Sequence, residues 1–413
     1  MADMSVEFCG LKFKNPIIVA SIEPSNSVDN IKKCIDNGAA GVIVKTVSEM
    51  KSMSTLTKHS KYAILNDKGQ PIRGKVPRNF TFYSRSGYIS EHYEEWIAYL
   101  KETQAYAEQH GAHVIGNVSA GTLDMWATLC KMTEDCGVPM IEINLHNPYP
   151  TEWAGKYPGT MIAQNPEATY EITRRCVEAI DIPVIVKLTP EAIDLTEIAK
   201  AAKEAGAAAV SVNSRFKGFA TDIETGTPYI GGTAGVGGPW VKPITLRWVQ
   251  DIYSKLGMEI AGSNGIFDGR DAIEFLMTGA RIMQVGSVLM LKGIEWLPKV
   301  IGDVEKFMDS HGYETVDDLY GISSRRAAPS LEELFKASPL QAYIDHEKCK
   351  FPKCTTCIKN CYYDALNEGE EQVVSTESNC IGCELCWNVC PWDAIRMGPK
   401  DLSTTAIEAL LVE

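Results

Sequence analysis

A run of closely spaced cysteines near the end of the chain constrains the fold more than any other feature. Residues 380–391 read CIGCELCWNVCP, in which the cysteines recur as C-x2-C-x2-C-x3-C followed by proline. Three thiolates at this spacing bind three irons of one cubane [4Fe–4S] cluster, and the fourth binds the other cluster where two are present. The run therefore predicts an iron–sulfur domain and requires a second set of cysteines.

That second set lies within residues 349–361. The crossed ligand pattern assigns one cluster to Cys349, Cys354, Cys357 and Cys390, and the other to Cys361, Cys380, Cys383 and Cys386. Four residues, Pro352 among them, separate the first two cysteines where two are usual, so we expect an atypical potential and exposure for the first cluster. A zinc ribbon of two C-x2-C pairs is the alternative, but the triple spacing and the trailing C-P argue against it.

The composition fits two domains without a membrane span. At 413 residues, 45% of them hydrophobic, the chain is long enough for a large barrel and a smaller domain. A formal net charge of −13 argues against nucleic acid and anionic membranes, and suits an electron-transfer partner with a basic face. The remaining cysteines are scattered, and Asp3 and Glu7 stand where a signal peptide would be basic, so we expect a cytoplasmic protein.

Apolar strands and helical segments alternate before the cysteine domain. After a hairpin turning at Cys9-Gly10, strands are expected at 17–21, 42–46, 114–119, 140–144, 183–188, 208–213, 258–263 and 281–286. Helices are expected between them, for example at 31–37, 90–110, 166–179, 194–205 and 268–279. This pattern indicates a parallel (β/α)8 TIM barrel, although a doubly wound sheet would give similar spacing.

We predict four segments along the chain. The α/β barrel is expected over residues 1–310, ending in a helix at 301–310, and a polar linker over 311–340. A small α+β two-cluster ferredoxin domain is expected over 341–397, followed by a tail over 398–413.

Two glycine-containing loops lie where barrel enzymes commonly bind phosphate, after the seventh and eighth strands. They begin Gly262-Ser263-Asn264-Gly265-Ile266 and Val285-Gly286-Ser287. Glycine lets backbone N–H groups approach a phosphate closely, and the start of a following helix favours negative charge. No G-x-G-x-x-G follows a strand, so we do not expect a nicotinamide dinucleotide bound in Rossmann fashion. A barrel phosphate site beside iron–sulfur clusters suggests FMN.

Lysines and asparagines end four other strands. Lys45 and Lys187 each end an apolar run, where an ammonium could face the electron-rich side of a reduced flavin. Asn144 and Asn213 end the fourth and sixth strands, where amides can hydrogen-bond a planar heterocycle or a substrate. Each residue alone is also explained as a solvated strand end or a loop cap, but two such lysines together favour a site.

Several motifs share one resemblance. They are Phe13-Lys14-Asn15-Pro16, Val44-Lys45-Thr46, Lys187-Leu188-Thr189-Pro190, Val212-Asn213-Ser214, Val241-Lys242-Pro243-Ile244 and Gln284-Val285-Gly286-Ser287. With these motifs the first 310 residues resemble the class 1 dihydroorotate dehydrogenase family. With the cysteine domain attached, the whole chain is similar to the iron–sulfur and FMN subunits of bacterial NAD-dependent dihydropyrimidine dehydrogenases.

The resemblance implies a cofactor site, a substrate site and a partner. FMN would be held by Ala20, Ser21, Lys45, Thr46, Asn117, Asn144, Lys187, Asn213, Gly238, Gly262, Asn264, Gly265, Gly286 and Ser287. Asn144, Asn213 and Ser214 would also contact a small-molecule substrate. The resemblance further implies a homo- or hetero-oligomer, with an FAD- and NAD(P)H-binding subunit or a ferredoxin exchanging electrons with the clusters.

The loop after the fourth strand departs from the family. Where the family carries N-x-S-C-P or N-x-S-S-P, with the Cys or Ser as catalytic acid/base, this chain has Asn144-Leu145-His146-Asn147-Pro148. Asn147 occupies the catalytic place, but an amide cannot usefully exchange a proton at neutral pH. His146 titrates near 6.5 when unperturbed, so it and Tyr83 are the candidates for proton transfer, with a structural histidine as the alternative.

Two further departures concern the substrate. Arg85 lies in a stretch where the family has a substrate-binding asparagine, and a guanidinium there would suit a carboxylate by bidentate pairing; a surface arginine is the alternative. Glu23 has no counterpart in the family. We therefore expect an oxidoreductase acting on a C–C bond conjugated to a carbonyl or carboxylate, with hydride passing at flavin N5. The alternatives are a dihydropyrimidine dehydrogenase proper and an electron-transfer subunit without a substrate of its own.

Overall fold

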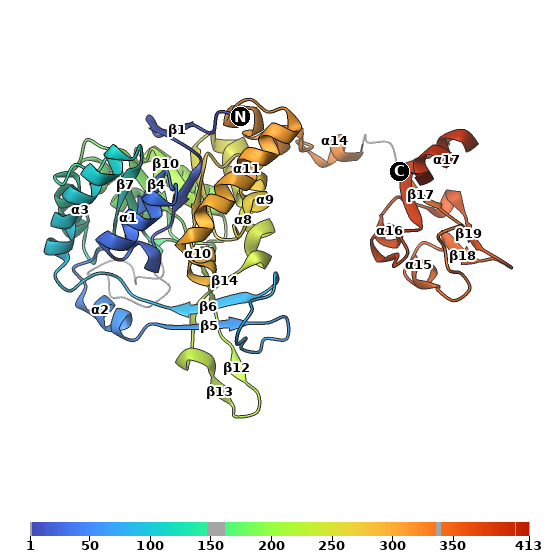
Figure 1. Ribbon diagram of the computed structural model, residues 1–413, viewed down its shortest axis with the longest axis horizontal. Coiled ribbons are helices and arrows are strands. Elements are labelled where there is room, and N and C mark those ends of the chain that lie inside the picture. Colours follow the sequence, from blue (N-terminus) through green and yellow to red (C-terminus); the bar gives the residue numbers. More distant parts are fainter. Residues whose placement is uncertain (1, 147–161, 336–339, 401, 413) are drawn as a thin grey trace. The chain divides into compact units, whose positions relative to one another are not determined.

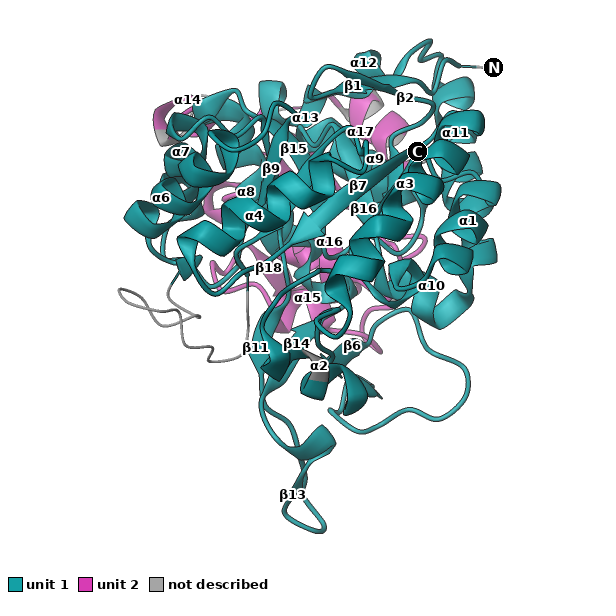
Figure 2. Cartoon of the chain, turned by 90° about the vertical axis from the view of Figure 1, so that its left-hand side faces the viewer, with its two compact units in different colours: residues 1–326 teal, residues 327–413 magenta. Residues whose placement is uncertain are grey.

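The computed structural model describes residues 2–146, 162–335, 340–400 and 402–412. The chain divides into two compact units, Met1–Arg326 and Ala327–Glu413, drawn in teal and magenta in Figure 2. Within the described residues, no helix is long and apolar enough to cross a membrane.

Eight parallel strands close into a barrel in the first unit (Figure 1). They are β3 (Ile17–Val19), β4 (Gly41–Ile43), β7 (His113–Val118), β8 (Ile141–Asn144), β9 (Val184–Lys187), β10 (Ala209–Val212), β15 (Glu259–Ser263) and β16 (Ile282–Val285). Each strand pairs with the next, and β16 pairs with β3, which closes the barrel. The predicted TIM-like barrel is confirmed, and all eight predicted strands lie in it. An open doubly wound sheet is excluded by this closure.

Helices form the outer layer of the barrel. The longer ones are α1 (Val28–Asp36), α3 (Tyr93–Gln109), α4 (Leu123–Glu134), α6 (Pro166–Val177), α7 (Leu195–Glu204), α8 (Lys242–Leu256), α9 (Gly269–Thr278) and α11 (Leu297–His311). Several begin at a side chain that accepts a backbone N–H of the first turn, namely Ser27, Thr122, Asn165, Asp194 and Asp268. Such caps satisfy donors that have no partner within the helix. Shorter helices are α2 (Lys51–Lys58) and α10 (Ser287–Lys292).

The N-terminal hairpin closes as predicted. Strands β1 (Val6–Phe8) and β2 (Leu11–Phe13) pair antiparallel around Cys9 and Gly10. Both turn residues have positive φ, of 50° and 75°, as a two-residue hairpin loop requires.

A second sheet, which was not predicted from the sequence, lies beside the barrel mouth. It contains β5 (Lys61–Leu65), β6 (Thr81–Arg85), β14 (Ala234–Gly237) and β11 (Phe216–Gly218), all antiparallel. The first two strands come from the loop after β4 and the other two from the loop after β10. The small hairpin of β12 (Thr221–Asp222) and β13 (Thr227–Pro228) extends away from this sheet (Figure 1).

Part of the predicted linker belongs to the barrel unit instead. Helices α12 (Val316–Leu319) and α13 (Ile322–Arg326) both pack against α9. The Val316 and Leu319 side chains are buried, and Thr315 forms a capping box at the start of α12. The linker prediction started too early because these short amphipathic turns have the polar composition of a loop.

The second unit is a small α+β domain. It contains α14 (Leu331–Phe335), β17 (Leu340–Ile344), α15 (Thr356–Lys359), β18 (Leu366–Glu368), β19 (Val373–Ser375), α16 (Leu385–Val389), β20 (Ile395–Pro399) and α17 (Thr404–Val412). The β17 and β20 strands pair antiparallel, as do β18 and β19, and a small core of Ala342, Leu366, Val373, Cys386 and Ile395 lies between these elements.

Candidate active site and cysteine cavities

A cavity of about 990 Å³ opens at the C-terminal ends of the barrel strands. One side is formed by the residues that end the strands, and the other by Tyr62, Phe82 and Ser84 on one face of the second sheet. Barrel enzymes place their active sites at this end because the βα loops that carry the functional residues converge there.

Most of the predicted site residues line this cavity. They are Ala20, Ser21, Lys45, Thr46, Asn144, His146, Lys187, Asn213, Ser214, Asn264, Gly265, Gly286 and Ser287. Three predicted cofactor residues do not. Asn117 is buried beside the cavity and donates to Glu142, and a Cβ at Gly262 would lie 2.4 Å from the Phe275 ring, so this glycine serves strand–helix packing. A Cβ at Gly238 would likewise lie 2.4 Å from the Phe80 carbonyl oxygen, so this glycine also allows close packing.

A buried charged network forms the floor of the cavity. Glu142 is fully buried and accepts from Lys187 Nζ at 3.1 Å and from Asn117 Nδ2 at 2.6 Å. Its second oxygen accepts from Gln284 Nε2 at 2.7 Å and from Ser211 Oγ at 2.5 Å. Every donor comes from a different barrel strand. The network therefore ties five strands together and holds the Lys187 ammonium at the base of the site.

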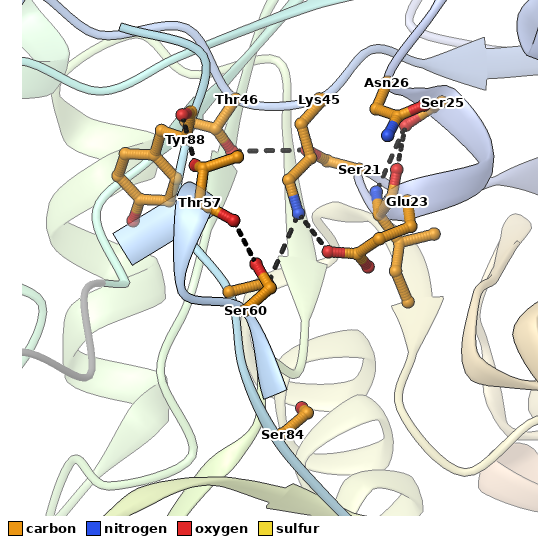
Figure 3. Close-up of polar contacts among 12 residues, drawn as sticks. Ser21, Glu23, Ser25, Asn26, Lys45, Thr46, Thr57, Ser60, Ser84 and Tyr88 are labelled. Carbon is orange, nitrogen blue, oxygen red and sulfur yellow. Dashed lines mark hydrogen bonds and ion pairs between the residues drawn. The ribbon is translucent and has the colours of Figure 1, made fainter. Parts of the chain in front are cut away.

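A second ion pair stands at the side of the cavity (Figure 3). Lys45 Nζ donates to Glu23 Oε1 at 2.9 Å and reaches Ser86 Oγ at 3.4 Å. The nearby Tyr62 hydroxyl also favours the ionised Glu23 carboxylate. Burial acts to raise the pKa of Glu23, but the Lys45 ammonium and these hydrogen bonds outweigh it and lower the pKa to about 2. Glu23 is therefore an anion throughout the physiological range and compensates Lys45.

His146 lines the cavity and has one ring nitrogen without a hydrogen-bond partner among the described residues. Its Nδ1 lies 3.0 Å from Thr189 Oγ1, and its Nε2 is buried without a partner among the described residues. Burial lowers the pKa of His146 well below its ordinary value, and the nearby cations Arg215, Lys187 and Lys217 lower it further. The imidazole is therefore neutral at physiological pH.

The cysteines of the second unit surround two cavities of about 320 and 350 Å³. One is lined by Cys349, Cys354, Cys357 and Cys390, and the other by Cys361, Cys380, Cys383 and Cys386. These are the two groups that the crossed ligand pattern predicts. Among the described residues, no three His, Cys, Asp or Glu side chains converge tightly enough for a single metal ion. The two sets of four thiols are therefore grouped as two separate iron–sulfur clusters would require.

Comparisons with known proteins agree with both units. The family model for dihydroorotate dehydrogenase matches residues 3–308, which is more than half of the chain. This chain belongs to the dihydroorotate dehydrogenase family. The model for the 4Fe-4S dicluster domain matches residues 342–397, which supports iron–sulfur clusters in the second unit of this family member.

Named relatives of this dihydroorotate dehydrogenase family member are redox enzymes. The catalytic subunit of dihydroorotate dehydrogenase B (NAD(+)) from Pyrococcus abyssi is 30% identical over 324 residues, covering 78% of this chain and 99% of that protein. The NAD-dependent dihydropyrimidine dehydrogenase subunit PreA from Escherichia coli is 26% identical over 416 residues, covering 96% of this chain and 95% of that protein. The chain is accordingly an oxidoreductase of the class that acts on CH–CH bonds.

The dihydroorotate dehydrogenase family implies FMN, and the cavity residues fit it. The Oδ1 atoms of Asn144 and Asn213 are buried and have no hydrogen-bond partner among the described residues, as expected of amides that await a heterocycle. The atoms nearest to a Cβ at Gly286 would belong to Ile22 and Ala20, at 3.4 Å or more, so a Cβ there would not clash, and Gly286 itself lines the cavity. The missing side chain leaves room for a phosphate to approach the backbone.

Two residues predicted to act on the substrate lie elsewhere. Tyr83 and Arg85 alternate with the cavity-lining Phe82 and Ser84 along β6, so they face the opposite side of the second sheet. The Tyr83 hydroxyl donates to the Gly232 carbonyl, and its ring is fully buried in a separate apolar cluster. These predictions were wrong about direction because the strand itself was not recognised. Asn147 lies outside the described residues.

The second sheet also brings in residues that the sequence analysis missed. Tyr62, Ser84 and Arg215 all line the cavity. The available signal was composition: Lys61–Leu65 and Thr81–Arg85 contain aromatic and β-branched residues, which are typical of strands, but neither segment alternates regularly between polar and apolar residues. No local signal links β6 to β14, since that pairing joins loops more than a hundred residues apart.

Replacing Cys386 by alanine is expected to remove one cluster and leave FMN bound. Iron per chain in anaerobically purified protein should fall from about eight to about four, and the coupled EPR signal of the reduced protein should become that of a single cluster. Cys136 lies in the barrel unit and bonds the Ile97 carbonyl, so Cys136→Ala serves as the control and should keep all the iron. Zinc in the unmodified protein, or unchanged iron in the Cys386 variant, would contradict the assignment.

Proposed function

We propose that this chain uses FMN and two [4Fe–4S] clusters to add or remove two hydrogens across a C–C bond conjugated to a carbonyl or carboxylate. The observation that carries the proposal is the barrel-mouth cavity, in which Lys187, Asn144 and Asn213 converge with unpaired buried amide oxygens. Bound there, FMN supplies hydride exchange and the conversion between two-electron and one-electron transfer. The thiol cavities of the same chain supply the route for single electrons.

Different residues of the protein would bind the cofactor and act on the substrate. Lys187, held by Glu142, would place a positive charge against the electron-rich part of the cofactor, and Asn144 and Asn213 would orient its ring by hydrogen bonds. The loops at Asn264-Gly265 and Gly286-Ser287 would bind its phosphate through backbone N–H groups. This set leaves His146 free to act on the substrate.

His146 would transfer the proton to and from the substrate. With Nδ1–H donating to Thr189 Oγ1, the neutral ring would keep a lone pair on Nε2, the nitrogen without a partner, and this lone pair could accept a proton from the saturated substrate. In the reverse direction the same nitrogen would return the proton. Since Tyr83 faces away from the cavity, His146 is the candidate for this role within the described residues.

A dihydropyrimidine dehydrogenase activity is the second candidate. It is favoured by the similarity, over nearly the full length of both chains, to a relative that carries this name. Because that relative is named as a subunit, we also propose an FAD- and NAD(P)H-binding partner that exchanges electrons with the clusters.

Flavin reduction under anaerobic conditions tests the proposal. Holoprotein with measured FMN and iron is mixed with dihydrouracil, dihydroorotate or small saturated carboxylates, and the flavin absorbance is followed. We expect bleaching by at least one of them, slowed in His146→Ala more than substrate binding is weakened. Protein that binds no FMN, or whose FMN none of these compounds reduces, would reject the proposed function.

A further inference from the structure

Arg215 is a cavity cation without a carboxylate partner among the described residues. The lysines around it are each paired: Lys45 with Glu23 at 2.9 Å, Lys187 with Glu142 at 3.1 Å and Lys217 with Glu191 at 3.8 Å. Arg215 instead donates from Nη1 to the carbonyl oxygen of Ser84 at 3.3 Å and to the Ser84 hydroxyl. Both are neutral acceptors. The described part of the cavity therefore carries one uncompensated positive charge.

The second sheet holds the guanidinium in place. Gly235 of β14 pairs with Ser84 of β6 on one side and with Lys217 of β11 on the other. A Cβ at Gly235 would lie 2.9 Å from Cζ and Nε of Arg215, so the side chain passes directly over this glycine. Glycine at this position thus opens the path by which Arg215 reaches Ser84. An ordered guanidinium loses less conformational entropy when it binds a ligand.

Most N–H donors of the Arg215 guanidinium have no hydrogen-bond partner among the described residues. Arg215 has five N–H donors, and the bonds to Ser84 use Nη1 alone, leaving Nε and Nη2 without a bond among the described residues. Nε and Nη2 form the planar fork that matches the two oxygens of a carboxylate. The charge of Arg215 also affects the pKa of His146 and of Lys45, so it acts at the part of the cavity where those side chains lie.

We propose that Arg215 binds a carboxylate of the substrate and makes this site selective for anionic over neutral substrates. Glu23 contributes by neutralising Lys45, which leaves the guanidinium as the cation that an incoming anion can pair with. The inference rests on the proposed function, because it takes the anion to be the substrate reduced or oxidised in this cavity. Arg215 thus takes the carboxylate-binding role that was predicted for Arg85 from the sequence.

The test compares ligands that differ in a carboxylate. Anaerobic holoprotein is titrated with orotate and uracil, and with cinnamate and cinnamamide, and dissociation constants are taken from the change in flavin absorbance. A charge-assisted bidentate contact predicts that the carboxylate of at least one pair binds about ten- to hundredfold more tightly. Arg215→Gln should abolish that preference. Gly235→Ala, which displaces the guanidinium but keeps its charge, should reduce it.

Arg85→Gln is the matched control, because Arg85 faces the other side of the second sheet, and it should keep the full preference. The proposal is overturned if neither carboxylate binds more tightly than its neutral partner, if the preference survives Arg215→Gln, or if Arg85→Gln abolishes it. In these cases FMN content and flavin bleaching can remain intact, so the proposed function would stand. If the unmodified protein bound no FMN, the proposed function itself would be rejected.

Discussion

Gly286→Val is expected to fold, to keep its iron and to lose nearly all of its FMN. The new side chain would start 3.4 Å or more from Ile22 and Ala20, an ordinary contact distance, and would extend into the cavity beside the backbone that is proposed to bind phosphate. A phosphate cannot occupy the same volume, and its contacts with the loop would be lost. FMN released by denaturing the purified protein, relative to protein and iron, measures the effect.

Gly302→Val provides the control for this variant. Gly302 lies in α11, and a Cβ there would meet no atom within 4 Å, so the same added side chain is placed away from the cavity. This control should retain FMN and iron. Stoichiometric FMN in Gly286→Val would show that the phosphate lies elsewhere, whereas loss of iron together with FMN would point to misfolding.

Glu142→Ala is expected to destabilise the barrel by about 3–5 kcal/mol. The substitution removes the fully buried Glu142 carboxylate and leaves the ammonium of Lys187, whose side chain is only 10% exposed, without its counter-ion. It also leaves the buried amide of Asn117 without the acceptor that it bonds at 2.6 Å. Unfolding of the anaerobic holoprotein, followed by circular dichroism with temperature, should show a large decrease in Tm.

Two comparisons identify the cause of that decrease. The double variant Glu142→Gln with Lys187→Met removes both charges and should recover much of the lost stability, because no unpaired charge remains buried. Glu178→Ala breaks an exposed pair with Arg174 and should cost only about 0–1 kcal/mol. If Glu142→Ala cost no more than Glu178→Ala, the buried pair would not be an important source of stability.

The sequence predicted the barrel well because its strands are short, apolar and regularly spaced. Segments such as Val184–Lys187 and Ala209–Val212 are buried on both faces, and only a few arrangements can bury eight such strands. The positions of the strands also predicted which residues lie at the strand ends and line the cavity. Four of them, Lys45, Lys187, Asn144 and Asn213, end a strand or follow it within two residues, so topology alone brings them to one edge.

Helical boundaries were less certain at the end of the barrel. Val316–Leu319 and Ile322–Arg326 are too short to show a helical period, and their burial against α9 comes from the tertiary fold. The linker predicted over 311–340 was therefore too long at its N-terminal end, since the first unit continues to Arg326.

By itself, the sequence determined the cysteine grouping, the order of the barrel strands and the positions of the strand-end lysines and asparagines, since each depends on spacing along the chain. The tertiary structure alone decided which way the residues of β6 face and which arginine enters the cavity. Tyr83 and Arg85 have the same local chemistry on either face of a strand, and a shift of one residue exchanges the faces. Arg215 reaches Ser84 only because strands from two distant loops pair across Gly235.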